Sequence, residues 1–299
     1  MEKITTLQDR YETTGTKVFH AINTVFIILV SLLSLFPFIH IVAKSFSSGK
    51  AIMSNQVLLW PVEFQLDSYT SVFKDANMTN SFGFTIILTL LYTVICMAMT
   101  ILAAYPMSKS YLPGKKVLMT FIIITMYFNA GTIPNYMVVK NLHLLDTIWS
   151  LILPGMISAY NMIILRTFFT SISPSMLEAA SLDGCSDFRA LTTIVLPLSL
   201  PILATLSLFY AVGRWNGFSD ALYYINDQNL YPLQLKLREI ILSDRMSDIA
   251  SLEASQMQKL VPDGVKAASI VFATVPILIP YPFLQKFFIS GVMIGAVKE

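Results

Sequence analysis

Long apolar stretches alternate with short polar segments along the whole chain. Stretches with few or no charges fall at about residues 18–43, 82–107, 117–139, 148–170, 190–213 and 267–289. A helix needs roughly 17 to 25 residues to cross about 30 Å of hydrocarbon, and each stretch lies near or above that length. The pattern predicts an all-α integral membrane protein with six transmembrane helices.

The polar segments between these stretches set the expected topology. Short cytoplasmic loops carry an excess of Lys and Arg, and the turn at 108–116 holds Lys109, Lys115 and Lys116. An even number of spans then leaves both ends of the chain in the cytoplasm. We expect a cytoplasmic segment at 1–17, one transmembrane domain at 18–290, a cytoplasmic tail at 291–299, outer loops at 44–81 and 214–266, and a cytoplasmic loop at 171–195.

The outer loops contain patterns of their own. Asp67-Ser68-Tyr69 is typical of a turn in a compact loop. A row of apolar residues precedes charged ones in the second loop and predicts an interfacial or surface helix, with Leu233, Leu235, Leu237, Ile240 and Ile241 on it.

Composition agrees with a membrane protein. Hydrophobic residues make up 55% of the chain and charged residues 13%, against about 25% charged in typical soluble domains, and the mean hydropathy is +0.65. These values exclude an ordinary soluble domain.

The first span is too long for the apolar region of a signal peptide, so we expect it to be retained. Cys96 and Cys185 are badly placed for a disulfide framework.

The loop between the fourth and fifth spans has the signals of a short helix. Ser173 can cap a helix whose first residue is Pro174, and Glu178 lies in its early turns, where the helix dipole favours an anion. Gly184 permits the left-handed residue that ends such a helix. A polar helix between two membrane spans indicates a docking element.

A second helix is predicted directly after the first. Ser186 can begin this helix with Asp187 in its first turn. Pro197 and Pro201 are expected to bend or break it, because proline lacks an amide proton and its ring clashes with the preceding turn.

The spacing of residues in this loop resembles a known motif. Glu178, Ala179 and Ala180, then Gly184, then Ile194, Leu196 and Pro197 match the EAA motif of ABC importer permeases. In that family the motif forms a cytoplasmic coupling helix that sits in a cleft of the ATPase subunit and transmits its motion. The resemblance implies that ATPase coupling involves Met176, Leu177, Glu178, Ala179, Ala180, Asp183, Gly184 and Arg189. An ordinary amphipathic connector is the alternative interpretation.

Two further stretches resemble carbohydrate-type permeases related to the second permease subunit of the maltose importer. They are GRWNGFSDALYYI and the C-terminal IVFATVPILIPYPFLQKFFISGVMIGAVKE, and they are most similar to the branch associated with uptake of oligosaccharides or polysaccharide fragments. The resemblance implies a bacterial cell-membrane protein assembled with a second homologous permease subunit, two ABC ATPase subunits and an extracytoplasmic solute-binding protein. It also implies ATPase contacts by the tail at Gly291, Gly295 and Lys298.

The sequence lacks the motifs of a nucleotide or metal site. The Gly-Lys pairs at 49–50 and 114–115 have neither the preceding glycine nor the following hydroxyl of a P-loop, and His20, His40 and His143 are scattered. We therefore expect no cofactor in this chain, no enzymatic activity of its own and no nucleic-acid partner. ATP and Mg would be bound by the partner ATPase subunits.

The predicted spans contain few charges, which argues against ions as cargo, because ion pathways usually carry charged residues within the membrane. Uncharged polar cargo fits better, and aromatic and amide groups suit sugar rings. The candidates for a sugar path are Tyr127, Asn129, Asn135, Tyr136, Asn161, Trp215 and Asn216. The same residue types also form interfacial belts and helix-packing contacts.

Other classes of function stay open. A membrane-embedded enzyme would need paired catalytic residues within the spans, which the sequence does not offer. A passive channel or secondary transporter would work without ATPase partners. An importer of amino acids or of another small polar solute would use the same architecture.

Overall fold

The structure is a computed structural model that describes residues 14–250 and 263–279. Every regular element within these residues is a helix, so the predicted all-α class is confirmed for them. The described residues form two compact units, each treated by itself. Unit 1 contains residues 14–72 and 263–271, and unit 2 contains residues 73–250 and 272–279.

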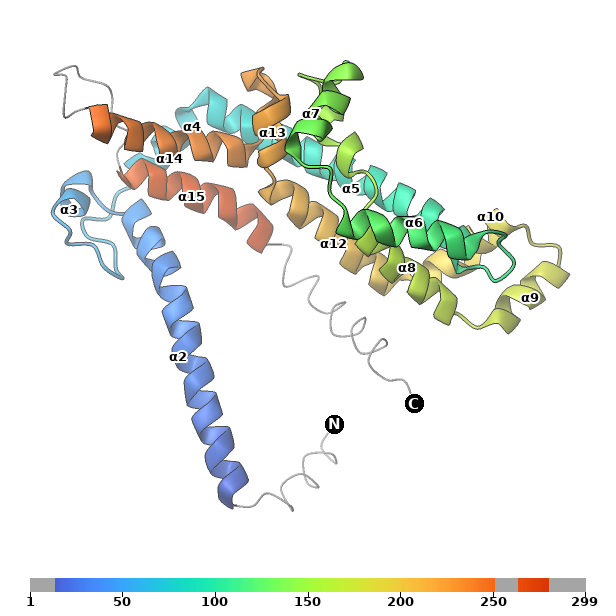
Figure 1. Cartoon of the computed structure of the whole chain (residues 1–299). Helices are drawn as coiled ribbons and strands as arrows, with labels where there is room; N and C mark the ends of the chain where they lie inside the picture. The colour runs from blue at the N-terminus through green and yellow to red at the C-terminus, as the bar shows by residue number, and fades with distance from the viewer. Residues whose placement is uncertain (1–13, 251–262, 280–299) are drawn as a thin grey trace. The chain divides into compact units, whose positions relative to one another are not determined.

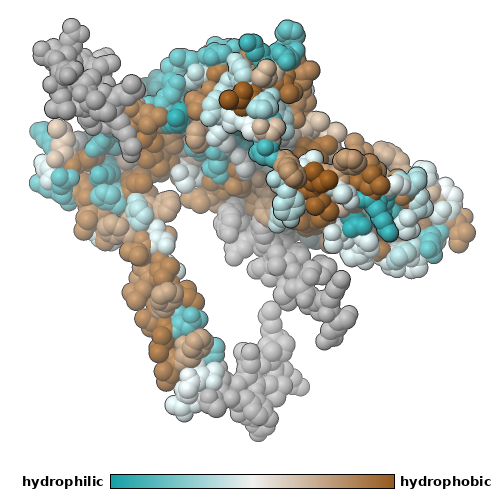
Figure 2. Space-filling model, viewed as in Figure 1, coloured by the Kyte–Doolittle hydropathy of each residue, from teal (hydrophilic) through white to brown (hydrophobic). Residues whose placement is uncertain are grey.

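Unit 1 begins with the long helix α2 (Thr14–Ser45), which contains the first predicted span. Apolar side chains cover most of the face of α2 seen in Figure 2, the pattern of a membrane helix. Two short helices follow, α3 (Gly49–Met53) and α4 (Asp67–Lys74). The predicted turn at Asp67-Ser68-Tyr69 is wrong, because these residues form the first turn of α4, where Asp67 complements the helix dipole.

Helix α5 (Ala76–Ser108) is the centre of unit 2 and contains the second predicted span. It packs along α12 (Leu200–Asn216) and α8 (Ala159–Ser171), and the three helices lie side by side in Figure 1. Each contributes fully buried side chains to one core, among them Cys96, Leu165 and Leu206. Because such cores are close-packed, displacement of one helix is transmitted to the others.

Several helices of different length close one end of unit 2. They are η1 (Ile148–Leu151), η2 (Leu153–Gly155), α13 (Ser219–Tyr224), η4 (Gln228–Leu230) and α14 (Leu233–Ala250). The helix predicted in the second outer loop is confirmed as α14. Leu233 and Leu235 are buried, and the Leu233 amide donates a hydrogen bond to Thr85 Oγ1 on α5 at 2.8 Å. The leucine row of α14 therefore packs against α5.

Three predicted spans are interrupted, and the sequence indicated a break in only one of them. The span at 117–139 divides into α6 (Lys115–Tyr127) and α7 (Thr132–Asn141), bent by 115°, because Gly131 takes a φ of 90° that helical residues do not adopt. The span at 148–170 starts as 3-10 turns around Pro154 and is bent by 52° before α8.

The third interruption lies in the span at 190–213. It is bent by 84° at Ser199, between Pro197 and Pro201, which confirms the predicted break. Two helices, α2 and α5, are long and apolar enough to cross a membrane, and the bent pairs raise the possible number to five. The sixth predicted span, at 267–289, begins within α15 (Asp263–Leu278), and its part from residue 280 lies outside the described residues. The count of six stays a prediction.

The loop predicted between the fourth and fifth spans forms the other end of unit 2. It contains α9 (Pro174–Leu182) and α10 (Asp187–Ala190), which Figure 1 shows far from α13 and α14. A π-helical turn, η3 (Leu191–Val195), and α11 (Leu196–Leu198) lead from α10 to α12.

Candidate functional site

Helix α9 starts where the sequence predicts. Pro174 is its first residue, where the missing amide proton costs no hydrogen bond. Ser173 precedes it, but the predicted side-chain cap is wrong: the Ser173 hydroxyl pairs with the Ser175 hydroxyl at 2.8 Å. The start of α9 therefore depends on the fixed φ of Pro174 more than on a capping serine.

Gly184 ends α9 as predicted. Its φ is 76°, the left-handed region that glycine enters without strain. The Gly184 amide donates to Ser181 O at 3.0 Å, and the Cys185 amide donates to Ala180 O at 2.9 Å. These two bonds form a Schellman motif, which pairs carbonyls that the helix end would leave unpaired. No atom lies within 4 Å of the position that a Cβ would take, so the requirement for glycine is conformational.

Helix α10 also begins as predicted. The Ser186 hydroxyl accepts a hydrogen bond from the Arg189 amide at 3.4 Å, and Asp187 is the first helical residue. The hydroxyls of Thr192 and Thr193 then bond to Arg189 O, at 3.1 and 2.7 Å, where the helix widens into η3. Such π turns are uncommon and are often found at functional sites.

The coupling residues predicted from the motif differ in exposure. Leu177 is half-buried against the core of unit 2, and Ala180 is half-buried too. The exposed members are Met176, Glu178, Ala179, Asp183 and Arg189. Two apolar side chains that the motif did not single out are also exposed in this loop, Leu182 at 89% and Phe188 at 69%. This end of unit 2 thus presents apolar and charged side chains together.

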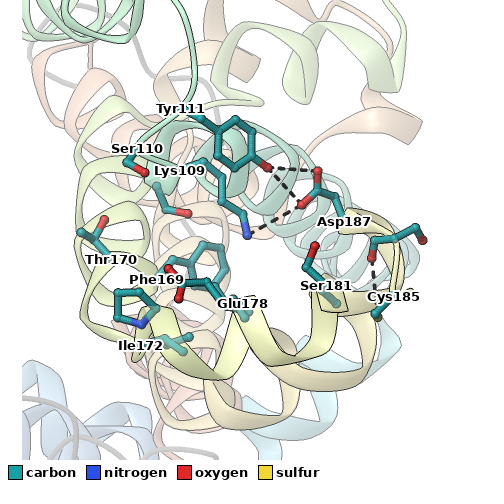
Figure 3. Close-up of a pocket in the computed structure, with 15 residues that line it drawn as sticks. Lys109, Ser110, Tyr111, Phe169, Thr170, Ile172, Glu178, Ser181, Cys185 and Asp187 are labelled. Atoms are coloured by element: carbon teal, nitrogen blue, oxygen red, sulfur yellow. Dashed lines mark hydrogen bonds and ion pairs between the residues drawn. The ribbon is translucent and has the colours of Figure 1, made fainter. Parts of the chain in front are cut away.

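A group of side chains that the sequence did not indicate surrounds Asp187 (Figure 3). The Tyr111 hydroxyl donates to the two carboxylate oxygens of Asp187 at 3.1 and 3.0 Å, and Lys109 Nζ lies 3.8 Å from Oδ1. The Tyr105 hydroxyl donates to the carbonyl of Asp187 at 3.0 Å. We call Tyr105, Lys109, Tyr111 and Asp187 the Asp187 cluster.

Three members of the Asp187 cluster, Lys109, Tyr111 and Asp187, line one side of a hollow of about 610 Å³. Glu178 and Ser181 of α9 lie across it, and Cys185 lies at its edge (Figure 3). Desolvation raises the pKa of Tyr111, and the hydrogen bond and negative charge of Asp187 raise it further. Tyr111 is therefore a protonated hydrogen-bond donor at neutral pH.

Two cations fix the turn that carries Lys109 and Tyr111. Lys115 Nζ donates to Lys109 O at 2.9 Å and to Ser108 O at 3.4 Å. Arg166 Nε of α8 donates to Met107 O at 3.2 Å. The carbonyls at the end of a helix need such donors, and positive charge there complements the helix dipole. Desolvation, with the nearby charge of Arg166, lowers the pKa of Lys115.

Four of the seven residues predicted for a sugar path lie on or beside the α6–α7 break, and the other three lie on α8 and α12. Tyr127 ends α6 and is 82% exposed, and Asn129 accepts a hydrogen bond from the Gly131 amide at 2.9 Å in the break that follows. Asn135 is exposed on α7. Tyr136 stacks on Tyr224 of α13, with 6.4 Å between ring centroids. These four residues surround the α6–α7 break.

The remaining three candidates lie on other elements. Asn161 is buried in the first turn of α8. Trp215 is buried, and its Nε1 donates to Ala273 O of α15 at 3.0 Å. Asn216 is exposed and its side-chain amide donates to Val212 O at 3.0 Å. Trp215 is thus engaged in helix packing here, whereas Tyr127 and Asn135 are accessible.

A buried cation beside Trp215 was not predicted. Arg214 is 6% exposed and donates to Leu151 O at 3.0 Å, to Gly217 O at 3.2 Å and to both oxygens of Asp220. A lone arginine at the end of an apolar span is the signal that could have identified it, because charges inside membrane segments need a partner. The predicted tail contacts at Gly291, Gly295 and Lys298 lie outside the described residues.

Comparisons with known proteins agree with this architecture. Residues 100–294 match the family described as "Binding-protein-dependent transport system inner membrane component". Protein LplC of Bacillus subtilis (strain 168) is 41% identical over 290 residues, which cover 96% of this chain and 97% of LplC. The polygalacturonan/rhamnogalacturonan transport system permease protein YtcP of the same organism is 40% identical over 275 residues, 91% of this chain and 96% of YtcP.

A solved structure is similar over nearly the whole chain. It is a chain of a bacterial ABC transporter involved in the import of the acidic polysaccharide alginate, with a TM-score of 0.84, 33% identity, and coverage of 93% of this chain and 99% of that one. The matched family consists of inner membrane components of transport systems, so the chain belongs to the transporter class. The chain is a member of the family of inner membrane components of binding-protein-dependent transport systems, and the resemblance to ABC importer permeases is confirmed.

Proposed function

We propose that this chain is the permease subunit of an ATP-driven importer of oligosaccharides, working by alternating access in the bacterial cell membrane. The observation that carries the proposal is the similarity to oligosaccharide and polysaccharide permeases along nearly the entire chain. Its partners would be a second homologous permease, two ABC ATPase subunits that bind ATP and Mg, and an extracytoplasmic solute-binding protein. Both termini would be cytoplasmic, with six spans in total.

The coupling role is assigned to the loop at 171–195. Its exposed apolar side chains, Met176, Leu182 and Phe188, and its charged Glu178 and Arg189 suit a protein partner, since interfaces combine an apolar centre with a polar rim. Closure of the ATPase subunits would displace α9, and the close-packed core of α5, α8 and α12 would carry that displacement into the membrane. The tail at 291–299 would add a second contact with the ATPase subunits.

The cargo proposed first for testing is an oligosaccharide containing uronate units. YtcP is named for polygalacturonan and rhamnogalacturonan, and the similar solved structure imports alginate, an acidic polysaccharide. The sequence alone favours uncharged cargo, so the charge of the sugar is the point to decide. Tyr127, Asn129, Asn135 and Tyr136, around the α6–α7 break, are the proposed path residues on this subunit, because broken membrane helices often border binding sites.

Uptake by the reconstituted complex tests the proposal. The complete assembly in vesicles, with its binding protein, is given labelled oligogalacturonates, alginate oligomers, neutral malto-oligosaccharides and amino acids in parallel. ATP-dependent uptake of the acidic sugars above the neutral ones supports the proposed cargo. Uptake of the neutral sugars alone would correct the sugar class, uptake of amino acids alone would contradict oligosaccharide import, and uptake without ATP would indicate a passive or secondary transporter.

A further inference from the structure

The Asp187 cluster joins two segments that are distant in sequence. Tyr111 is 76 residues from Asp187, and Tyr105 is 82 residues from it. The two tyrosines bind different parts of the same residue, one its carboxylate and the other its carbonyl. Asp187 is therefore held by both its side chain and its backbone.

The segment that holds Asp187 is itself firmly attached to the membrane helices. Tyr105 is buried at the end of α5 and packs edge-on against Phe169 of α8, with 6.2 Å between ring centroids. Lys115 and Arg166 bind the carbonyls of the same helix end. A displacement of Asp187 therefore acts on α5, α6 and α8 together.

The covalent connection from α10 to the membrane is less regular. It passes through the π turn η3 and then through the 84° bend at Ser199. A π turn has wider hydrogen-bonded rings than an α-helix, and a bend between two prolines lacks amide donors, so this route deforms more easily than a continuous helix. The contact through Asp187 bypasses both features.

We propose that the α5–α6 turn is a second arm of the coupling element, in which Tyr111 and Lys109 hold Asp187 so that α10 moves as one body with α5 and α6. The proposal rests on the proposed coupling role of the loop at 171–195. Tyr111 and Lys109 are positioning residues in it, acting through Asp187. Tyr111 has an exposed ring, so its hydroxyl can be removed without opening the core.

The ratio of ATP hydrolysed to sugar transported tests this arm in the full complex. In Tyr111→Phe the ratio should rise about threefold to tenfold, because the hydroxyl proton that the two oxygens of a charged carboxylate share is lost. Lys109→Met removes the ion pair and should raise the ratio less. Ser110→Ala is the matched control in the same turn, since no hydrogen bond of its hydroxyl occurs within the described residues, and it should keep the wild-type ratio.

The outcomes separate this inference from the coupling proposal beneath it. If Glu178→Lys reduces attachment of the ATPase subunits while Tyr111→Phe and Lys109→Met keep the wild-type ratio, the second arm is wrong and the coupling role of α9 stands. If Glu178→Lys, Tyr111→Phe and Lys109→Met all behave as wild type, both the second arm and the coupling role of the loop are wrong.

Cross-linking gives a second measurement, in which the contact is removed and then replaced by a covalent link. Tyr111→Cys and Asp187→Cys are combined with Cys96→Ala and Cys185→Ser, and the new pair is joined by a short bifunctional thiol reagent. If the two segments move as one body, the cross-linked complex regains transport relative to the same complex without the reagent. Loss of transport on cross-linking would mean that the segments must separate during the cycle, which overturns the proposal.

Discussion

Arg214 and Asp220 form a paired ion contact at the end of α12. Both terminal nitrogens of the guanidinium donate to the carboxylate, with Nη2 to Oδ1 at 2.9 Å, and Asp220 also accepts from the Ala221 amide. Arg214 is buried, and it lies over the Tyr92 ring of α5, 5.7 Å from the centroid. The pair thereby joins α12, α13 and α5.

Removing Arg214 should destabilise unit 2. In Arg214→Met, Asp220 and two carbonyls lose their donor, and we expect a loss of about 2 to 3 kcal/mol in the free energy of unfolding, since Asp220 is partly exposed. Arg214→Lys should lose less, because it keeps the charge but not the two-pronged geometry. Thermal unfolding in detergent measures both. Equal stability of Arg214→Met and wild type would show that the pair contributes nothing.

Substitution at Gly184 should affect coupling without affecting insertion. Gly184→Leu places a side chain on a left-handed residue, at a cost of roughly 1 to 2 kcal/mol, although no neighbouring atom obstructs it. ATPase activity stimulated by binding protein and cargo should fall. Gly184→Asn is the control, because asparagine tolerates this conformation. Normal uptake by Gly184→Leu vesicles would make the glycine an ordinary connector.

Charge reversal at Glu178 should weaken the attachment of the ATPase subunits. Glu178 is exposed and lines the hollow. The resemblance to the EAA motif implies that this carboxylate would face basic groups of the ATPase partner, and charge reversal would turn that attraction into repulsion. Co-purification of Glu178→Lys should decrease most at low salt, where repulsion is least screened. Glu178→Gln should show a smaller decrease. A subunit ratio that is constant across ionic strength would refute the electrostatic contact.

Acidification should loosen the contact between Asp146 and the segment after α13. The carboxylate of Asp146 accepts hydrogen bonds from the side chain of Asn226 and from the amides of Asn226 and Asp227, and these bonds lower its pKa below the ordinary 3.8. A carboxyl group with a lowered pKa stabilises the fold above its ordinary value, and this contribution is lost as the pH falls through the lowered pKa. Protection of the Asn226 and Asp227 amides from hydrogen exchange should therefore decrease below about pH 4. In Asp146→Asn the protection of these two amides should not depend on pH in this range. If the wild type and Asp146→Asn show the same protection at every pH, the prediction is wrong.

Alanine substitutions of Trp215 and Tyr127, two aromatic candidates for the sugar path, should have different effects on stability and on transport. Trp215→Ala should cost about 3 to 5 kcal/mol and reduce expression, because the ring is buried against Phe82 and α15. Tyr127→Ala should leave stability within about 0.5 kcal/mol, since the ring is exposed, and should change the ranking of oligosaccharides if Tyr127 contacts cargo. Uptake competition measures the ranking. An unchanged ranking would move recognition to the partner permease.

The local features of this protein follow from its sequence alone. Pro174 at the start of α9, Gly184 at its end and Ser186 at the start of α10 lie where their residue types indicate, because each acts on backbone groups within a few residues. The membrane class is equally local, since it depends on the length and apolar character of continuous stretches. The spacing of the residues that match the EAA motif indicated the family, and the comparisons confirm that family.

The tertiary structure decided which distant residues meet. Tyr111 binds Asp187 across 76 residues, and Trp215 bonds to Ala273 across 58, distances over which periodicity and capping carry no information. The 115° break between α6 and α7 could not be predicted either, because the length and apolar character of a stretch do not distinguish a straight helix from a bent one. Burial, partner choice and helix direction depend on packing between segments, and that packing is fixed only when the whole chain has folded.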